Sequence, residues 1–247
     1  MKLDIITVCV DYADFLAVTL PEAMKHGRVT VATAPKDLAT IELCKHHGVA
    51  CVVTDAWYQD GDPFNKGAGI NAALEARKPE GWLLSMDADI VLPPAPRNGT
   101  PIAQLDKQCM YGARRLECER MDRWEECLRE GNYFDLPLSP LPRIGKNGRV
   151  WGSRPTRNPI AVQGYFQLWH YGERPYKLYE WRDARKCDVS LALKFKDRER
   201  KLIPWPKYQV IHLGIRKKNW RGRLTETWST CTIPSGDLER AAEKHYE

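Results

Sequence analysis

Residues 82–90 read Trp-Leu-Leu-Ser-Met-Asp-Ala-Asp-Ile, an apolar run that ends in an Asp-x-Asp pair. The run predicts a buried β-strand, and Asp87 and Asp89 stand where this strand ends. In open α/β sheets, ligands bind beyond the carboxyl ends of the strands. Two carboxylates there can share a divalent cation with a diphosphate, and they share one face if the strand geometry continues through them. The alternative interpretation is a polar turn after a buried strand.

The chain before this strand alternates between short apolar runs and helical periodicity. Strands are predicted at Leu3–Val10, Val29–Thr33 and Val49–Thr54. Helices are predicted at Tyr12–His26, Asp37–His47 and Asn65–Arg77, with a polar loop at Asp55–Phe64. Alternation at this pitch indicates βαβ units with right-handed crossovers. We therefore expect a single α/β domain with a Rossmann-like, mostly parallel central sheet flanked by helices.

The regular alternation of predicted strands and helices stops after Leu92. Residues 93–99 read Pro-Pro-Ala-Pro-Arg-Asn-Gly, which predicts a loop, and long loops are expected over 131–159. Strands are predicted at Cys109–Arg114, Ile160–Tyr171 and Tyr208–Leu213. Helices are predicted at Leu116–Glu130, Arg182–Phe195 and Ser235–Tyr246.

Composition limits the class of protein. The 247 residues are 43% hydrophobic and 28% charged, as in globular proteins. No apolar run approaches the roughly 20 residues of a transmembrane helix, and Asp4 interrupts the N-terminal apolar run, so we expect no signal peptide. The eight cysteines form no C-x-x-C pair, which disfavours a zinc ribbon or a redox dithiol. The expected location is a reducing cytoplasm, bacterial or that of a phage-infected host.

The positive charge is concentrated in one block. The net charge is +6, but residues 194–223 contain eleven Lys or Arg against two Asp or Glu. A block this local predicts an anionic partner, such as a phosphate, a nucleotide or a nucleic acid. A solvated basic face is the alternative.

A second motif precedes the Asp-x-Asp strand. Residues 65–74 read Asn-Lys-Gly-Ala-Gly-Ile-Asn-Ala-Ala-Leu, at the predicted start of a helix. Small residues there allow close backbone approach, and a helix N-terminus favours an anion. Lys66 is in a position to reach a phosphate, although a tightly packed helix with Lys66 in solvent explains the pattern too. The P-loop pattern is absent.

In order and spacing, the first strand, the second strand with Asp37 after it, the Asn65–Asn71 motif and the Asp-x-Asp resemble the nucleotide-sugar domain of GT-A glycosyltransferases. The resemblance covers residues 3–92. It implies a donor-binding half at 1–92 and an acceptor-binding half at 93–247. The resemblance further implies a Mn²⁺ or Mg²⁺ ion at Asp87 and Asp89, with Asp87 near both metal and ribose. In the implied donor site, Asp11 and Asp37 lie near the base. Lys66 and Asn71 lie near the ribose or the diphosphate.

The second half of the chain fits this resemblance through His212, in the apolar run Val-Ile-His-Leu-Gly at residues 210–214. The resemblance implies that His212 completes the metal site, and imidazole suits Mn²⁺ better than Mg²⁺; a core histidine is the alternative. The basic segment that follows is implied to close over the donor diphosphate, through Arg216, Lys217, Lys218 and Arg221.

Acceptor and base residues are implied by the same resemblance. The strand around Trp169 is similar to the one that lines the acceptor pocket in family-2-like members, and an aromatic core strand is the alternative. Inverting members use a carboxylate base. Aligning residues 188–193 with that region places Arg185 and Lys186 where the family has its Glu-Asp pair. Either Asp188 or Asp183 supplies the base, with Asp188 favoured, or the enzyme retains configuration and needs none there.

The sequence thus predicts a metal-dependent glycosyltransferase, hexosyl or pentosyl, that uses a nucleoside-diphosphate sugar. The acceptor is a saccharide, a glycolipid headgroup or a hydroxylated DNA base, the last because small enzymes of this kind occur in phages. A nucleotide- or nucleic-acid-binding protein on the same scaffold, without transfer, is the alternative. A nucleotidyltransferase is disfavoured because Thr7–Asp14 contains no Gly and no Lys.

Overall fold

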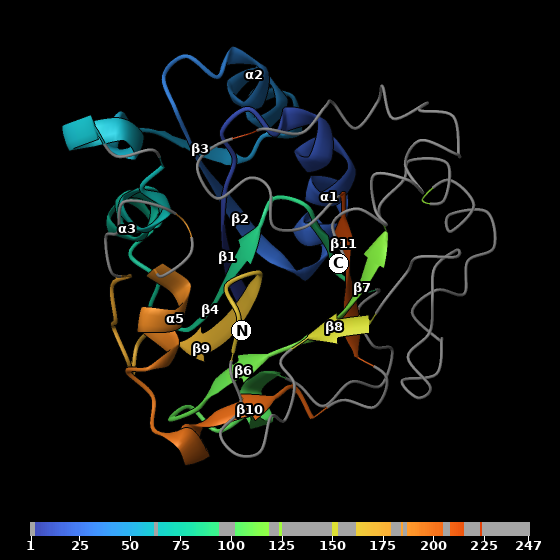
Figure 1. Ribbon diagram of the computed structural model, residues 1–247, viewed down its shortest axis with the longest axis vertical. Helices are drawn as coiled ribbons and strands as arrows, with labels where there is room; N and C mark the ends of the chain where they lie inside the picture. Colours follow the sequence, from blue (N-terminus) through green and yellow to red (C-terminus); the bar gives the residue numbers. More distant parts are fainter. Residues whose placement is uncertain are drawn as a thin grey trace, which may run out of the picture.

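The computed structural model describes residues 3–61, 64–93, 102–118, 124, 150–152, 162–178, 184, 187–204, 208–214 and 223. Seven strands form the central sheet in the order β10-β6-β9-β4-β1-β2-β3 (Figure 1). Their bounds are β1 Leu3–Val8, β2 Gly27–Thr33, β3 Ala50–Val53, β4 Trp82–Asp87, β6 Met110–Gly112, β9 Phe166–His170 and β10 Arg200–Leu202. Only β9 runs antiparallel to its neighbours, β4 and β6, so the predicted α/β fold with a mostly parallel sheet is confirmed.

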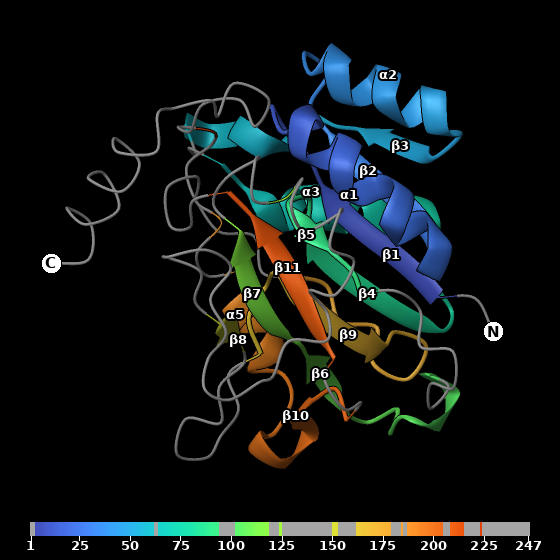
Figure 2. The same cartoon turned by 90° about the vertical axis from the view of Figure 1, so that its right-hand side faces the viewer.

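Helices cover both faces of this sheet (Figure 2). On one face, α1 (Ala13–His26) and α2 (Leu38–His47) bury side chains such as Leu16 and Cys44 against Ile5. On the other face, α3 (Lys66–Arg77) and α5 (Cys187–Ala192) pack around Ile6. Successive residues of β1 thus point into different cores, as a strand buried on both faces requires.

Local signals in the sequence set the helix ends. The carboxylate of Asp37 accepts a hydrogen bond from the Thr40 amide at the start of α2, and the side chain of Asn65 accepts one from the Ala68 amide at the start of α3. Each cap satisfies a backbone amide that has no partner within its helix. Gly48 ends α2 with a φ of 64°, a left-handed conformation that glycine adopts without penalty.

A second sheet, which the sequence did not predict, has the order β5-β11-β7-β8. Its strands are β5 Ile90–Val91, β7 Arg114–Cys118, β8 Val150–Gly152 and β11 Gln209–Leu213. The predicted helix at Leu116–Glu130 is wrong over its first three residues, because these belong to β7 and pair with β11. Trp124, within the same prediction, is helical and packs with Leu116.

The other predicted elements are partly described. The strand expected at Cys109–Arg114 is divided between β6 and the start of β7, and the helix at Arg182–Phe195 is described as α5. A 3₁₀ helix, η1 (Ala56–Gly61), occupies the predicted polar loop, and two more, η2 (Ile102–Gln104) and η4 (Asp197–Glu199), lie near the sheet edge. The loops predicted over 131–159 are wrong at Val150–Gly152, which form β8 and pair with β7. The rest of that range and the predicted helix at Ser235–Tyr246 lie outside the described residues. In the part of the chain that is described, no helix has the length and apolarity needed to cross a membrane.

Gly69 allows η1 to pack on α3. A Cβ at Gly69 would lie 1.8 Å from the ring of Trp57, which is fully buried and stacks on Phe64 with 5.5 Å between ring centroids. We predict that Gly69→Ala lowers the free energy of unfolding by about 1–3 kcal/mol through overpacking, measured by urea denaturation.

Gly81→Ala is the matched control for this substitution, since nothing lies within 4 Å of a Cβ at Gly81. Its effect should stay within about 0.5 kcal/mol. An exposed helical glycine would instead gain about 1 kcal/mol on replacement by alanine, so stabilisation by Gly69→Ala would contradict the packing described here.

Candidate functional site

The two aspartates of the Asp-x-Asp pair have different partners. Asp87 is the last residue of β4, and its Oδ1 accepts a hydrogen bond from the ammonium of Lys66 at the start of α3. Asp89 lies in the turn between β4 and β5, and its Oδ2 is 3.3 Å from Nε2 of His212 on β11. Strand geometry ends at Asp87, so the expectation that both carboxylates share one strand face does not apply.

The second sheet brings His212 to this turn. His212 is paired with Ile90 in the antiparallel ladder between β11 and β5. The amide of Leu213 donates to the carbonyl of Asp89 at 2.8 Å. These backbone contacts fix the side chains of Asp89 and His212 next to each other, although they are far apart in the sequence.

The environment of Asp89 favours the charged carboxylate. Burial works to raise its pKa, but the charge and hydrogen bond of His212, together with the charges of Arg115 and Lys66, hold the pKa below its usual value. Within the described residues, Asp89 Oδ1 and His212 Nδ1 are buried without a hydrogen-bond partner. Asp89 Oδ1, on the carboxylate that faces His212, can accept a further bond from a ligand or a water, whereas Nδ1 lies on the side of the imidazole ring away from Asp89.

Asp89 and His212 suit a divalent cation as two of its ligands. Their facing atoms are 3.3 Å apart, close to the separation of about 3 Å between adjacent ligands that each lie about 2.1 Å from one ion. No cluster of three potential ligands occurs in the described part of the chain, and Asp87 is bonded to Lys66. A cation held by this pair would take its other ligands from phosphate oxygens and water, as Mg²⁺ commonly does.

Lys66 is a buried ion-pair partner in this structure. Its side chain is 7% exposed, and its ammonium bonds to Asp87. Burial works to lower its pKa, but the charges of Asp87, Cys187 and Asp188 raise the pKa above its usual value, so the ammonium is protonated. The alternative of a solvent-exposed Lys66 is wrong, and the contact of Lys66 with a donor phosphate stays a prediction.

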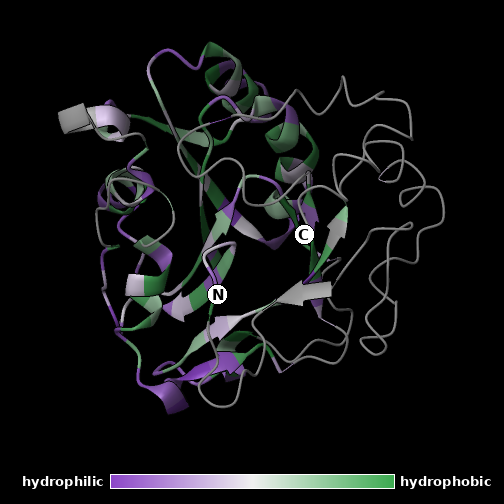
Figure 3. Ribbon diagram, in the orientation of Figure 1, coloured by the Kyte–Doolittle hydropathy of each residue, from purple (hydrophilic) through white to green (hydrophobic). Residues whose placement is uncertain are grey.

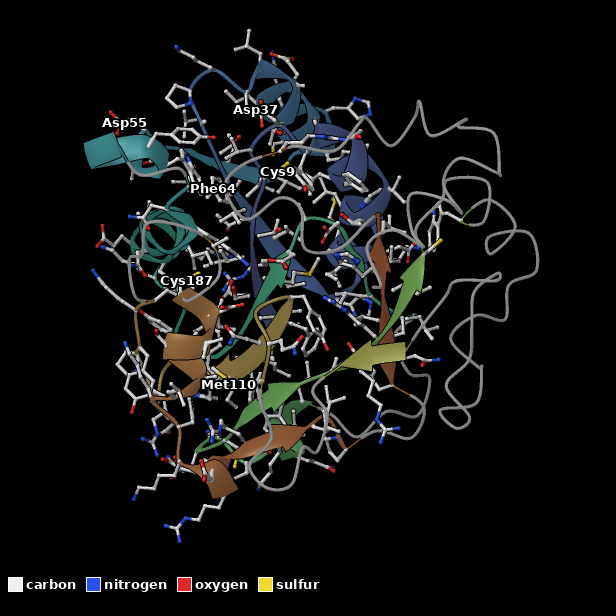
Figure 4. All side chains as sticks on the ribbon, in the orientation of Figure 1. Cys9, Asp37, Asp55, Phe64, Met110 and Cys187 are labelled. Atoms are coloured by element: carbon white, nitrogen blue, oxygen red, sulfur yellow. The ribbon has the colours of Figure 1, made fainter. Side chains whose placement is uncertain are left out.

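Asp188, predicted as the base, lies on α5 near this ion pair. Its backbone carbonyl accepts a hydrogen bond from Gln167 Nε2 at 2.8 Å, and a Cβ on Gly164 would lie 1.9 Å from its Oδ2. Burial, with the charge of Asp87, raises the pKa of Asp188 despite the opposing charge of Lys66. A carboxyl group with a raised pKa suits proton transfer at neutral pH better than an ordinary one. Cys187, the first residue of α5, is labelled in Figure 4.

The predicted base-binding residues Asp11 and Asp37 lie side by side at the carboxyl edge of the sheet, Asp11 in the turn after β1 and Asp37 after β2. Asp37, labelled in Figure 4, accepts four hydrogen bonds, from the amides of Asp11 and Thr40 and the hydroxyls of Thr33 and Thr40. These bonds give Asp37 the local role of ordering the turn. Asp11 is exposed.

Tyr58, which the sequence analysis missed, lies near this turn on η1. Its side chain is 48% exposed. Burial of its hydroxyl and the charges of Asp11 and Asp37 raise its pKa. The adjacent aromatic residues Trp57 and Tyr58 in an otherwise polar loop are the sequence signal for this side chain.

Two predicted binding residues belong to the interior. Trp169, predicted to line the acceptor site, is fully buried, and its indole N–H donates to the carbonyl of Arg174 at 3.1 Å. The acceptor prediction for Trp169 is therefore wrong, because no face of its ring is available for stacking. Asn71 is also buried, and its amide group bonds to the backbone of Leu178 at 2.8 and 3.0 Å. Asn71 thus ties α3 to the segment after β9.

The basic block does not form one surface in the described residues. Its first part lies in η4 and β10 at the sheet edge, the strongly hydrophilic region of Figure 3. There, Arg200 pairs with Asp197 and Lys201 with Asp106. Its last residue, Arg223, instead contacts Asp14 on α1. The remaining predicted residues of the site lie outside the described part of the chain: Asp183, Arg216, Lys217, Lys218 and Arg221.

No protein-family model and no curated protein matches this chain. Among solved structures, it is similar to glucosyl-3-phosphoglycerate synthase from Mycobacterium tuberculosis in complex with UDP, at 10% identity and a TM-score of 0.47, over 96% of this chain and 74% of that chain. The same protein with Mn²⁺, UDP and phosphoglyceric acid gives 11% identity and a TM-score of 0.46, over 98% and 75%. Mannosyl-3-phosphoglycerate synthase from Rubrobacter xylanophilus shares 16% identity at a TM-score of 0.34, over 49% of this chain and 40% of that chain.

By their names, these neighbours are synthases of glucosyl- or mannosyl-3-phosphoglycerate. This chain spans less than half the length of the mannosyl synthase. Because each TM-score is below 0.5, the function proposed next rests on the side chains of this chain.

The ion pair between Lys66 and Asp87 generates a stability prediction. Lys66→Met leaves the carboxylate of Asp87 without its cation in a partly buried place, so we expect a loss of about 1–3 kcal/mol in the free energy of unfolding. The double variant Lys66→Met/Asp87→Asn should recover part of this loss, because it removes the unpaired charge. Urea denaturation measures both.

Lys25→Met is the control, since Lys25 is 63% exposed in its pair with Glu22 on α1. Surface pairs of this kind contribute less than about 1 kcal/mol. Equal losses for Lys25→Met and Lys66→Met would show that Lys66 behaves as an ordinary surface lysine.

Proposed function

We propose that this protein is a metal-dependent glycosyltransferase that moves a sugar from a nucleoside-diphosphate donor to an acceptor hydroxyl. The observation that carries the proposal is the pair of Asp89 and His212. A carboxylate and an imidazole, 3.3 Å apart and each with a buried unpartnered atom among the described residues, face each other beside the end of β4. Ligands bind at such carboxyl ends in open α/β sheets.

Asp89 and His212 would hold a Mn²⁺ or Mg²⁺ ion, with Asp87 as the predicted further residue near metal and ribose. The cation, when bound, supplies the positive charge that stabilises the departing nucleoside diphosphate. Asp89 is suited to this role because its carboxylate is kept ionised. Lys66 holds Asp87 at the same end of β4.

Asp188 is the proposed base of the transfer. As the acceptor oxygen forms its bond to the anomeric carbon, the bond from that carbon to the diphosphate oxygen breaks, and the hydroxyl proton passes to the carboxylate of Asp188. This step inverts the anomeric configuration. The charge of Lys66 favours the ionised carboxylate of Asp188, and the charge of Asp87 opposes it.

We assign residues 1–92 to donor binding and 93–247 to acceptor binding, with His212 contributed to the donor side by the second half. The acceptor we propose is a saccharide hydroxyl. Support for this choice over a hydroxylated DNA base comes from Arg200 and Lys201 of β10, which are paired with Asp197 and Asp106. DNA carrying hydroxymethylated bases forms the second arm of the acceptor assay.

The metal pair is tested by Asp89→Asn and His212→Asn. We expect each to lower Mn²⁺-dependent release of nucleoside diphosphate from a panel of UDP- and GDP-sugars by about a hundredfold or more, because the Lewis acid contributes several kcal/mol to the transition state. Each should also weaken Mn²⁺ binding measured by EPR titration.

Asp106→Asn serves as the carboxylate control, since Asp106 is 51% exposed beside Lys201 at the sheet edge. Full activity of Asp89→Asn would refute the assigned metal pair. A wild-type protein that binds UDP or GDP but releases neither from any sugar would favour the binding protein without transfer.

The proposed base is tested by its pH dependence. The raised pKa of Asp188 places its deprotonation above the usual value of about 3.9 for aspartate, so transfer should rise with pH through that higher pKa. Asp188→Asn should abolish this acidic limb and slow transfer at least about a hundredfold, while nucleotide binding is retained. An unchanged profile and product configuration retained at the anomeric carbon would exclude Asp188 as the base.

A further inference from the structure

Asp11 has an unusual backbone conformation at the carboxyl edge of the sheet. Its φ is 59°, in the left-handed region that side chains rarely adopt. Lys78, the other described residue of this kind outside glycine, is an ordinary helix C-cap. Asp11 instead lies between β1 and α1, where no helix end explains it. Such conformations persist only where the surroundings hold them, and they gather at functional sites.

Two side chains from distant parts of the sequence hold the backbone of Asp11. The carboxylate of Asp37 accepts a hydrogen bond from the Asp11 amide at 2.8 Å. The guanidinium of Arg223 donates to the Asp11 carbonyl at 2.7 Å. Both polar backbone groups of Asp11 are therefore satisfied by side chains, one from the start of α2 and one from the C-terminal region.

Arg223 is itself firmly anchored. Its guanidinium binds both carboxylate oxygens of Asp14 on α1, with a distance of 2.8 Å from Nη2 to Oδ2. It also lies over the rings of Tyr12 and Phe15, at 4.9 and 5.2 Å from their centroids. The side chain is 11% exposed. A bidentate, stacked arginine of this kind has a fixed geometry that lysine does not reproduce.

We infer that Arg223 is a positioning residue for the nucleoside of the donor, acting by locking Asp11 in its left-handed conformation. The inference rests on the proposed function. Asp11 is exposed, so its carboxylate is available to accept hydrogen bonds from the hydroxyl or N–H groups of a nucleoside. Without the contact from Arg223, the turn would relax toward ordinary backbone conformations, and only a fraction of the molecules would present Asp11 correctly.

The test separates the nucleoside from the diphosphate. Calorimetric titration of Arg223→Leu with UDP and with GDP, in the presence of Mn²⁺, should give affinity about tenfold weaker than wild type for the nucleotide that wild type binds, because the binding-competent turn becomes a minor conformer. Affinity for inorganic pyrophosphate with Mn²⁺ should stay within about twofold, since pyrophosphate has no nucleoside. A general loss of structure would weaken both ligands alike.

Two further variants distinguish geometry from charge. Arg223→Lys keeps the positive charge but loses the bidentate contact, so it should weaken nucleotide binding nearly as much as Arg223→Leu. Asp14→Asn removes the anchor of the arginine and should act in the same direction. If Arg223→Leu fails to fold, these two variants carry the test. Arg77→Leu is the matched control, because Arg77 pairs with the buried carboxylate of Asp4 on the same strand, β1, away from the Asp11 turn.

Each outcome of these titrations either supports or overturns the inference about Arg223. Selective loss of nucleotide affinity in the Arg223 and Asp14 variants, with Arg77→Leu unchanged, supports the inference. Unchanged nucleotide affinity, equal loss for nucleotide and pyrophosphate, or full rescue by Arg223→Lys overturns it while the proposed function stands. A wild-type protein that binds neither nucleotide nor pyrophosphate overturns the proposed function itself.

Discussion

The pairing of β11 with β5 is the contact on which the candidate site depends. β5 contains only Ile90 and Val91, and the ladder with β11 joins just two residue pairs. This short ladder places His212 beside Asp89 and thereby combines residues that are 123 positions apart in the chain. Backbone hydrogen bonds set the position of His212. Water does not compete with these bonds, because the surrounding residues of β11 are buried: Gln209, Ile211 and Leu213.

Charge compensation shapes the rest of the site. Lys66 neutralises Asp87 and lies close to Asp188, so three ionisable groups from β4, α3 and α5 share a partly buried region. A buried carboxylate without a cation would be costly. In the turn at Asp11, charged side chains also fix the structure. The carboxylate of Asp37 and the guanidinium of Arg223 take the place of backbone hydrogen-bond partners for Asp11. The site is therefore held together by ion pairs and hydrogen bonds between side chains from separate elements.

Sequence reasoning predicted the first half of the fold well and the second half poorly, for physical reasons. β1 and β4 are continuous apolar runs because both of their faces are buried, and Asp37 and Asn65 are caps that can be read locally. β5, β7 and β8 are two to five residues long, too short to show a period of two, so β7 was mistaken for the start of a helix.

The residues of the candidate site could likewise be predicted only where a local sequence pattern marks them. His212 and Asp89 could be proposed from sequence because Asp89 follows the apolar run of β4 and His212 lies within the apolar run of β11. Trp169 was misassigned because an aromatic residue in a core strand and one in a binding site look alike in sequence; only its burial distinguishes them. The roles of Lys66 and Arg223 depend on partners 21 and 209 residues away, and no local pattern reveals such pairs.

A crystal structure of the protein with Mn²⁺ and UDP, analysed by anomalous scattering at the manganese edge, tests the central claim most directly. The account predicts one anomalous peak at about 2.0–2.3 Å from a carboxylate oxygen of Asp89 and from Nε2 of His212, with the diphosphate completing its coordination. A manganese ion bound elsewhere, with Asp89 and His212 still joined only to each other, would contradict it.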